Sequence, residues 1–356
     1  MKKDNRLILI DGSGYIFRAY YALPPMNRSD GTPVNAVYGF TNMLIKLIED
    51  YGDERLIVIF DAARKNFRNS IFPQYKANRG DTPEDLIPQF DLIKTCVKAF
   101  NIPQLEIEGF EADDIIATYT KLSKQEKITS LIISSDKDLM QLVNEETKML
   151  DPIKNKFIGV NEVVEKFGVK PDKVTQIQAL TGDKIDNIPG VPGIGPKTAA
   201  ELINTFGNLN KLINNINEIK QDKRRKIIKE HIADIKISFE LVKLKNDIKL
   251  PIVIDQIKPY SQSAVKDDSI KKFLIKQEFK TLLQRIEKNP LIFKDIKNKQ
   301  KTYSKKITYH TINDLSKLKE IIKKIQVKKI CAIDTETDSL NIEEANLVGI
   351  SLSFEE

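Results

Sequence analysis

The sequence predicts an α/β fold built on a mainly parallel sheet, followed by a helical second part. Four short apolar runs bounded by turn residues are predicted as buried strands, at residues 6–11, 55–61, 102–107 and 129–135. Helical patterns lie between these runs, and this alternation over residues 1–170 is typical of βαβ units. Acidic residues stand at or just after the ends of three of the four runs, which points to one edge of the sheet.

The acids at element ends are the most informative feature of the chain. Asp11 ends the run RLILID, Asp61 ends RLIVIFD, and Asp136 and Asp138 follow SLIIS. Because the carboxyl ends of parallel strands meet at one crevice of an open sheet, we expect these side chains to lie close together. The candidate set comprises Asp11, Asp61, Glu111, Asp113, Asp114, Asp136, Asp138, Asp183 and Asp186.

So many neighbouring carboxylates would repel one another, and a multivalent cation offsets that repulsion. An all-oxygen ligand set favours Mg²⁺ or Mn²⁺ over zinc. Two such ions a few ångströms apart suit phosphodiester hydrolysis.

Some of these acids also have a simpler explanation. In GFEADDIIA, Glu111 and Asp114 share one face at a helix start, where the helix dipole favours acids in any protein. In TGDKIDN, Asp183 and Asp186 fit an ordinary hydrated loop. Four acidic groups in series, each at the end of a strand or helix, favour a shared metal site over coincidence.

Composition adds a weaker indication. The net charge of +7 and the pI of about 9.0 fit a polyanionic partner such as nucleic acid, although an AT-biased genome also enriches lysine. Cys96 and Cys331 provide neither a disulfide framework nor a zinc motif. No apolar stretch reaches the length of a membrane span and the N-terminus lacks a signal sequence, so we expect a cytoplasmic protein with no membrane contact.

Residues 171–290 are predicted to be mostly helical and to contain a second motif, GVPGIGPKTAA. Gly190, Gly193 and Gly195 allow tight turns, and Pro196 suits the first position of a helix. The free N–H groups of that helix start, with Lys197 beside them, form a phosphate site. We therefore predict a helix-hairpin-helix that grips a DNA backbone without reading bases.

Three further segments complete the organisation. Residues 62–88 are basic and weakly periodic, with aromatic residues among the cations, and are expected to form a mobile arch over the site rather than core. Residues 291–306 are lysine-rich and are predicted as a solvated linker. A new α/β pattern begins at residue 307 and runs for only a few elements, so 307–356 is expected to be the truncated beginning of a further domain.

Seven strings together resemble the 5′-nuclease (flap endonuclease) family, specifically the N-terminal half of bacterial DNA polymerases I. They are LIDGSGYIFRAYYA, VIFDA, YKANR, GFEADDIIA, ISSDKDLMQLV, LTGDKIDNIPGVPGIGPKTA and AIDTETDSL. The resemblance covers essentially the whole chain and implies a PIN-like nuclease core. It also implies that Asp11, Asp61, Glu111 and Asp113 surround one divalent ion and Asp136, Asp138, Asp183 and Asp186 a second, with Asp114 bridging or behind them.

The resemblance assigns further roles to basic and aromatic residues. Arg18, Tyr75, Lys76 and Arg79 are similar to residues that steer and clamp the scissile phosphate. The hairpin at Gly193, Gly195, Lys197 and Thr198 resembles a duplex-binding element that often holds a potassium ion. Asp334 and Glu336, in AIDTET, resemble the first metal motif of a 3′–5′ exonuclease domain, and we expect two acids alone to give no 3′–5′ activity.

These features predict a monomeric, structure-selective nuclease that removes 5′ flaps and RNA primers from DNA in replication and repair, acting also at nicks, as part of a DNA polymerase I. One alternative is a non-catalytic DNA-binding fragment of the same fold, which would bind flaps without cleaving them. Another is a metal-dependent phosphatase or ribonuclease of related architecture, which would have no need of a duplex grip.

Overall fold

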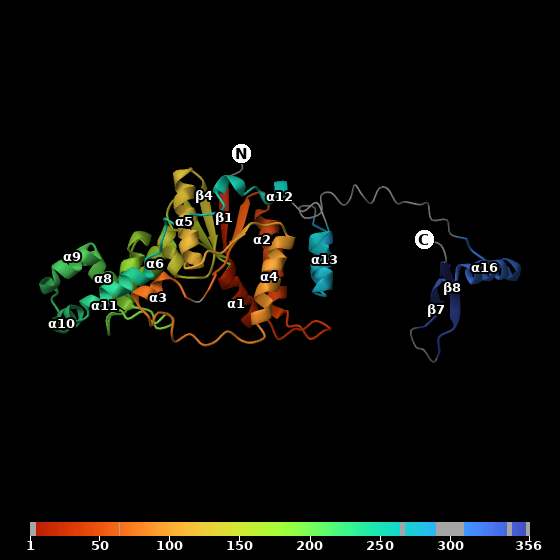
Figure 1. Cartoon of the computed structure of the whole chain (residues 1–356), viewed down its shortest axis with the longest axis horizontal. Helices are drawn as coiled ribbons and strands as arrows, with labels where there is room; N and C mark the ends of the chain where they lie inside the picture. Colours follow the sequence, from red (N-terminus) through yellow and green to blue (C-terminus); the bar gives the residue numbers. More distant parts are fainter. Residues whose placement is uncertain (1–4, 64, 264–267, 290–309, 340–343, 354–356) are drawn as a thin grey trace. The chain divides into compact units, whose positions relative to one another are not determined.

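The central element of the computed structural model is a six-stranded sheet in the order β3-β2-β1-β4-β5-β6 (Figure 1). The strands are β1 (Arg6–Asp11), β2 (Arg55–Ile59), β3 (Gln104–Leu105), β4 (Thr129–Ile133), β5 (Thr147–Asp151) and β6 (Lys156–Ile158). The first five are parallel to their neighbours and β6 pairs with β5 in the antiparallel sense. The predicted α/β fold with a mainly parallel sheet is confirmed, whereas β5 and β6 were not predicted.

The structure describes residues 5–63, 65–263, 268–289, 310–339 and 344–353. The chain divides into two compact units, residues 1–297 and 298–356. The predicted linker at 291–306 lies outside the described residues. Within the described ranges no helix is both long and apolar enough to cross a bilayer.

Strand β1 is buried on both of its faces, which explains its continuous apolar sequence. Leu7 and Leu9 contribute to the core on one side of the sheet, and Ile8 and Ile10 to the core on the other side. The register pairs Asp11 with Ile59 of β2, so the carboxyl ends of β1 and β2 reach the same edge.

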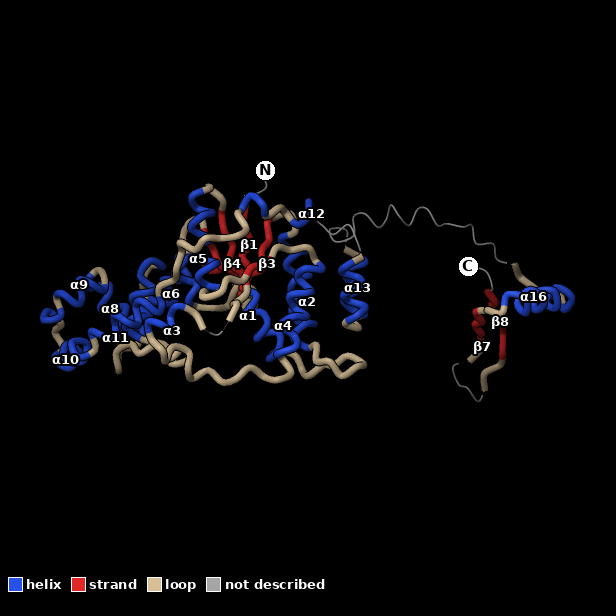
Figure 2. The backbone as a smooth tube through the Cα atoms, in the orientation of Figure 1, coloured by secondary structure: helices blue, strands red, loops and turns tan. Residues whose placement is uncertain are grey.

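Helices cover both faces of the sheet (Figure 2). The Ile8 side is covered by α1 (Gly12–Ala22), α2 (Asn35–Tyr51), α4 (Ile87–Ala99), α13 (Ser269–Lys276) and α14 (Lys280–Glu287). The Leu7 side is covered by α5 (Ala112–Gln125), the 3₁₀ helix η1 (Asp138–Leu142) and α6 (Val160–Phe167). The late helices α13 and α14 thus return to the sheet instead of extending the helical part to residue 290.

The helical part continues the core on the Leu7 side. It comprises η2 (Pro171–Lys173), α7 (Val174–Thr181), α8 (Pro196–Phe206), α9 (Leu209–Asn214), η3 (Ile216–Glu218), α10 (Asp222–Glu230), α11 (Ile232–Val242) and η4 (Ile254–Gln256), whereas Tyr260 of α12 (Tyr260–Ser263) belongs to the core on the Ile8 side. Buried side chains of α7 and α8, such as Ile177 and Ile203, belong to the same apolar cluster as Leu7 and Ile115. The carboxylate edge of the sheet and the predicted hairpin therefore belong to one continuous body.

The predicted arch is only partly an open loop. Within 62–88, α3 (Phe67–Ile71) is followed by a long stretch of coil and turns that runs to α4 (Figure 1). Arg68 is 1% exposed and Tyr75 is 5% exposed, and Tyr75 packs with Ile188 and Leu241. The expectation that the segment lies outside the core is therefore wrong for this part, because two of its side chains are buried.

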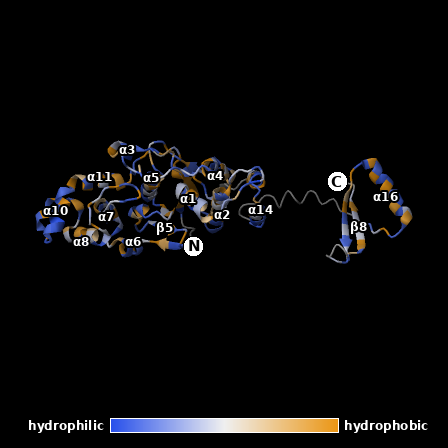
Figure 3. Ribbon diagram, turned by 90° about the horizontal axis from the view of Figure 1, so that it is seen from below, coloured by the Kyte–Doolittle hydropathy of each residue, from blue (hydrophilic) through white to orange (hydrophobic). Residues whose placement is uncertain are grey.

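The second unit consists of α16 (Leu315–Lys328) and an antiparallel pair, β7 (Ala332–Thr337) and β8 (Leu347–Ser353). The expected strand at its start, residues 307–310, lies almost wholly outside the described residues. Every residue of β7 is exposed, and α16 has no buried residue although apolar and polar residues alternate along it (Figure 3). Its apolar side chains therefore find no core among the described residues of this unit.

Candidate metal centre and nucleic-acid interface

Asp11 lies where β1 passes into α1 and caps that helix. Its Oδ1 accepts a 2.9 Å hydrogen bond from the Gly14 N–H, and its Oδ2 accepts a 2.7 Å bond from the Ser134 hydroxyl at the end of β4. Ser134 Oγ also accepts from the Asp136 N–H at 3.0 Å, so one serine joins the ends of β1 and β4. Burial raises the pKa of Asp11 to about 6, and the charges of Asp61 and Asp136 raise it further.

Asp61 and the N-terminus of α5 meet at the same edge. Asp61 Oδ1 accepts a 2.7 Å bond from the Ala112 N–H, one of the free donors of the first turn. Asp113 follows Ala112 in that turn, and its pKa is raised well above its usual value by burial and by the charges of Asp136 and Asp11. Glu111 behaves differently: burial opposes ionisation, but Lys76 and Arg68 lower its pKa below the usual value.

The loop after β4 carries the next pair of acids. Asp136 Oδ1 accepts a 2.8 Å bond from the Asp138 N–H, which turns the chain into η1. Asp138 accepts a hydrogen bond from the Gln178 side chain of α7, so this acid touches the helical part as well as the sheet. Burial, followed by the charge of Asp136, raises the pKa of Asp138 to about 7.

Asp183 and Asp186 lie in a loop between α7 and α8 that is closed by a pair of backbone hydrogen bonds. The Asp183 N–H donates to the Ile188 carbonyl at 3.0 Å and the Ile188 N–H donates back at 2.7 Å. Gly182 and Gly190 both have positive φ, of 65° and 61°, and a Cβ on Gly190 would lie 2.3 Å from the Gly182 nitrogen. Only glycine permits this crossing, which holds the two acids next to the hairpin turn.

Four of the candidate acids are paired with cations in the structure: Asp114 with Arg68, and the three described next. The Lys76 ammonium lies 2.5 Å from Glu111 Oε1, and the Lys137 ammonium lies 2.5 Å from Asp183 Oδ2. Arg79 pairs with Asp186, and Lys76 Nζ lies 3.8 Å from Asp186 Oδ2. Tyr75 donates from its hydroxyl to Glu111 at 3.1 Å.

The electrostatics divide the acids into two overlapping groups. After burial, the charges of Asp61 and Asp136 raise the pKa values of Asp11 and Asp113, whereas the charges of Asp136, Asp186 and Asp183 raise the pKa of Asp138. Asp136 therefore lies between the groups. Among the described residues no three acids already surround one point, since lysine and arginine side chains hold several of them. A divalent ion would have to displace these cations.

Of the two roles expected for Asp114, the structure contradicts that of a bridging metal ligand and fits that of an acid behind the ligands. Its oxygens accept from Arg68 Nη1 at 2.7 Å and Nη2 at 2.8 Å, and also from the N–H groups of Lys245 at 2.9 Å and Glu111 at 3.2 Å. Four donors fill the lone-pair positions that a carboxylate offers, so none is left for an ion. Asp114 instead holds the start of α5 in place.

Sequence reasoning missed Arg68 and Lys137 as parts of the site. Arg68 was hidden in a polar segment 46 positions before its partner, and no local pattern marks such a pair. Lys137 had a visible signal, because it stands between Asp136 and Asp138 in SSDKDL.

Arg18 comes from α1 and reaches the β5–β6 turn. Its Nη2 donates a 3.1 Å bond to the Pro152 carbonyl, and its guanidinium lies 6.0 Å from the centre of the Tyr15 ring. Its Nη1 is buried and has no hydrogen-bond partner among the described residues. One N–H of this cation is thus available to an acceptor that comes with a ligand.

The predicted hairpin turn lies between α7 and α8. Gly195 caps α8 and Pro196 is its first residue, as predicted. Gly193 has a φ of 78°, and a Cβ there would meet nothing within 4 Å. Gly193, Gly195 and Lys197 are exposed and Thr198 is half-buried, so the free N–H groups of this helix start face solvent.

Asp334 and Glu336 lie on β7 of the second unit. They are two residues apart on one strand, so their side chains share a face of the hairpin, and both are exposed. No further acid was predicted to join this pair.

Two family models match the first unit. Residues 6–168 match the N-terminal resolvase-like domain of 5′-3′ exonucleases, and residues 169–264 match the C-terminal SAM fold of the same family. The junction at residue 168 falls directly after α6, where the helical part begins.

Curated relatives agree with these models. A DNA polymerase I of Rhizobium leguminosarum is 48% identical over 294 residues, which is 80% of this chain and 29% of that protein. A 5′-3′ exonuclease of Aquifex aeolicus is 36% identical over 282 residues and matches along 95% of its own length. The chain thus spans about a third of the polymerase relative and nearly the whole of the exonuclease relative.

Solved structures share the fold. A structure of T5 5′-exonuclease with bound zinc ions has a TM-score of 0.57 at 24% identity, covering 77% of this chain and 98% of the other. A crystal structure of the T5 flap endonuclease with DNA and metal ions has a TM-score of 0.56 at 23% identity, with the same coverage.

Proposed function

The chain belongs to the 5′-3′ exonuclease family found in bacterial DNA polymerases I, and on that premise we propose that it removes 5′ flaps and RNA primers from duplex DNA by metal-dependent phosphodiester hydrolysis. The observation that carries the proposal is the crowding of acids at the carboxyl edge of the sheet, where burial and the charge of Asp136 raise the pKa values of both Asp11 and Asp113. Such crowding has a physical reason if a multivalent cation binds there.

The donor set fits two Mg²⁺ or Mn²⁺ ions. Asp11, Asp61, Glu111 and Asp113 would hold one ion, and Asp136, Asp138, Asp183 and Asp186 the other, with Asp136 able to face both. All of these ligands are carboxylate oxygens, which these ions prefer. A pair of such ions supplies Lewis-acid polarisation of the phosphoryl oxygens and stabilises the leaving oxygen.

The cations of the α3 segment would act on the substrate. Lys76 and Arg79 neutralise Glu111 and Asp186 in the structure, and binding of divalent ions to the acids would release them. Both side chains would then donate to the scissile phosphate and stabilise the charge that develops on it. Tyr75, anchored through its hydroxyl to Glu111, would fix the position of this segment.

The hairpin before α8 would bind the duplex. Its exposed N–H groups and Lys197 suit a phosphate of the DNA backbone, and its turn carbonyls would accept a potassium ion. Figure 1 shows α8 at one end of the first unit and the sheet at its centre, so a duplex on the hairpin would lead towards the acids.

The test is cleavage of a 5′-labelled flap duplex with Mg²⁺ and with EDTA, resolved by product length, with a 3′-overhang duplex as the control. We expect short, discrete 5′ products with Mg²⁺ alone and an intact 3′ overhang. Tight binding without any cleavage would support the non-catalytic module instead. Release of inorganic phosphate alone would indicate a phosphatase.

A further inference from the structure

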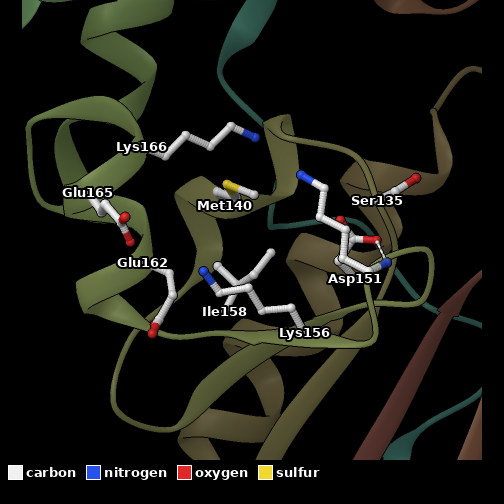
Figure 4. Close-up of a pocket in the computed structure, with 9 residues that line it drawn as sticks. Ser135, Met140, Asp151, Lys156, Ile158, Glu162, Glu165 and Lys166 are labelled. Carbon is white, nitrogen blue, oxygen red and sulfur yellow. Dashed lines mark hydrogen bonds between the residues drawn. The ribbon is translucent and has the colours of Figure 1, made fainter.

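A pocket lies beside the acidic edge and belongs to none of the groups described so far. It has a volume of about 400 Å³ and lies between the loop after β4, η1, the β5–β6 hairpin and α6 (Figure 4). Ser135 and Met140 line it, and these residues directly precede Asp136 and closely follow Asp138. The pocket therefore borders the acids expected to hold metal.

Three lysines line this pocket: Lys154 from the β5–β6 turn, Lys156 from β6 and Lys166 from α6. None of the three forms an ion pair with any residue that the structure describes. In Figure 4 the Lys166 side chain extends over Met140 and the Lys156 side chain extends below it, so the two amines approach the pocket from opposite sides.

Two of the three acids that line the pocket have backbone partners, and the third is Glu165. Asp151 Oδ1 accepts from the Ile153 N–H at 2.8 Å and the Lys154 N–H at 3.2 Å, which shapes the turn. Glu162 Oε2 accepts from the Gly159 N–H at 2.8 Å and caps α6. The pKa of Lys166 is lowered by burial and by the nearby charges of Lys154 and Lys137, against the opposite effect of Asp136 and Asp151.

The shape and lining suit a nucleotide unit. A volume of 400 Å³ lies in the range of small-molecule sites, and Met140 and Ile158 give the pocket apolar surface for a sugar or base. The hairpin that carries Asp151 and Lys154 is also held by Arg18, whose Nη1 lacks a described partner. Lysines and apolar surface therefore lie together in the pocket, and Arg18 binds the neighbouring turn at Pro152.

We propose that this pocket is a DNA subsite that holds one nucleotide next to the cleavage point, with Lys154, Lys156 and Lys166 binding its phosphate. The proposal rests on the proposed nuclease function and adds to it a second backbone contact, separate from the hairpin. The contact is to phosphate and thus independent of sequence.

The test compares two triple variants that each remove three positive charges. The pocket variant is Lys154→Gln, Lys156→Gln and Lys166→Gln, and the control variant is Lys272→Gln, Lys276→Gln and Lys280→Gln on α13 and α14. The control lysines are exposed and lie outside both the metal site and the pocket. Binding of a 5′-flap duplex is measured by fluorescence anisotropy in EDTA over a series of NaCl concentrations.

The pocket variant should bind about tenfold more weakly, the value expected for loss of one charge-assisted contact. For this variant, the slope of the logarithm of the binding constant against the logarithm of the NaCl concentration should be shallower by about 0.7–0.9, which corresponds to loss of one phosphate contact. Equal slopes for the two variants would overturn the proposal.

A scan of single methylphosphonates along the DNA keeps the test decisive if the triple variant does not fold. One uncharged position near the cleavage point should weaken wild-type binding, and Lys156→Gln should abolish that sensitivity. Persistence of the sensitivity in Lys156→Gln would overturn the subsite. If the wild-type protein cleaves the flap and the pocket variant binds DNA as well as the wild type, the subsite alone is rejected. If the pocket variant binds DNA more weakly but the wild-type protein does not cleave it, the nuclease assignment alone is rejected.

Discussion

Arg68 binds Asp114 through two parallel hydrogen bonds of 2.7 and 2.8 Å, and both side chains are almost completely buried. Arg68 Nε also donates to the Leu241 carbonyl at 2.7 Å, at the end of α11. One guanidinium thus joins α3, the start of α5 and the end of α11. The segment that carries Lys76 and Arg79 is therefore fixed at one end to the same helix that presents Asp113.

Removal of one member of this pair should destabilise the fold strongly. Asp114→Leu leaves the Arg68 charge buried without its partner, and we expect a loss of about 3–5 kcal/mol in the free energy of unfolding, measured with urea. Adding Arg68→Met to Asp114→Leu should restore part of that loss. The exposed control Asp91→Asn should change stability by less than about 0.5 kcal/mol. A double variant less stable than Asp114→Leu would contradict a purely structural pair.

The metal-free protein should lose stability as the pH rises from about 4 to about 7. The pKa values of Asp11 and Asp138 are raised to about 6 and about 7, so the folded state binds more protons than the unfolded state across this interval. The free energy of unfolding therefore falls with rising pH. Thermal melting in EDTA at pH 4.5, 5.5 and 7 measures this trend.

Divalent ions should reverse the trend, because they bind the ionised carboxylates. Addition of Mg²⁺ should raise the melting temperature more at pH 7 than at pH 5. Below about pH 4 the lowered pKa values of Glu111 and Asp183 act in the opposite direction, and acid then destabilises the protein. An equal Mg²⁺ effect at both pH values would argue against binding at these acids.

Asp136→Asn should abolish cleavage while duplex binding remains. The change removes the charge of the acid that affects both groups of the site, and leaves the hairpin untouched. Single-turnover cleavage with Mg²⁺ and anisotropy in EDTA give the two readouts. Asp91→Asn, with the same change of charge on the exposed surface of α4, should retain wild-type activity. Wild-type turnover by Asp136→Asn would reject the assigned metal site.

Lys197→Ala should weaken duplex binding equally for all sequences and lower the salt dependence by about one phosphate. Lys197 lies in the first turn of α8 beside the free N–H groups. A lysine and backbone N–H groups together bind a DNA phosphate and do not distinguish between bases. Competition between duplexes of different base composition measures the effect. A loss confined to particular sequences would contradict a backbone grip.

Parts of this structure follow directly from sequence pattern. The run RLILID predicted β1 because burial on both faces removes alternation, and the glycines around Pro196 predicted the start of α8 because few residues other than glycine adopt such turns. Strand β5 was missed because exposed Lys148 interrupts a short apolar run. Strand β6 has only three residues, which is too short for a periodic signal.

The arrangement of charges within the site was less accessible to sequence. All nine acids could be selected because they stand at element ends, but the sequence left open whether Asp114 bridges the ions or lies behind their ligands. That distinction depends on Arg68 and on the Lys245 N–H, which come from distant segments. Tertiary pairing decides which acid faces the crevice and which faces the interior.

The close contact between the Gly182 and Gly190 backbones fixes the distance between the acids and the hairpin turn. Because the two backbones touch, the loop with Asp183 and Asp186 cannot slide relative to the turn that leads into α8. A duplex seated on Lys197 would meet the acids at a constant distance from its point of attachment. The cleavage position would then be set by a fixed number of base pairs along the DNA duplex and not by the base sequence.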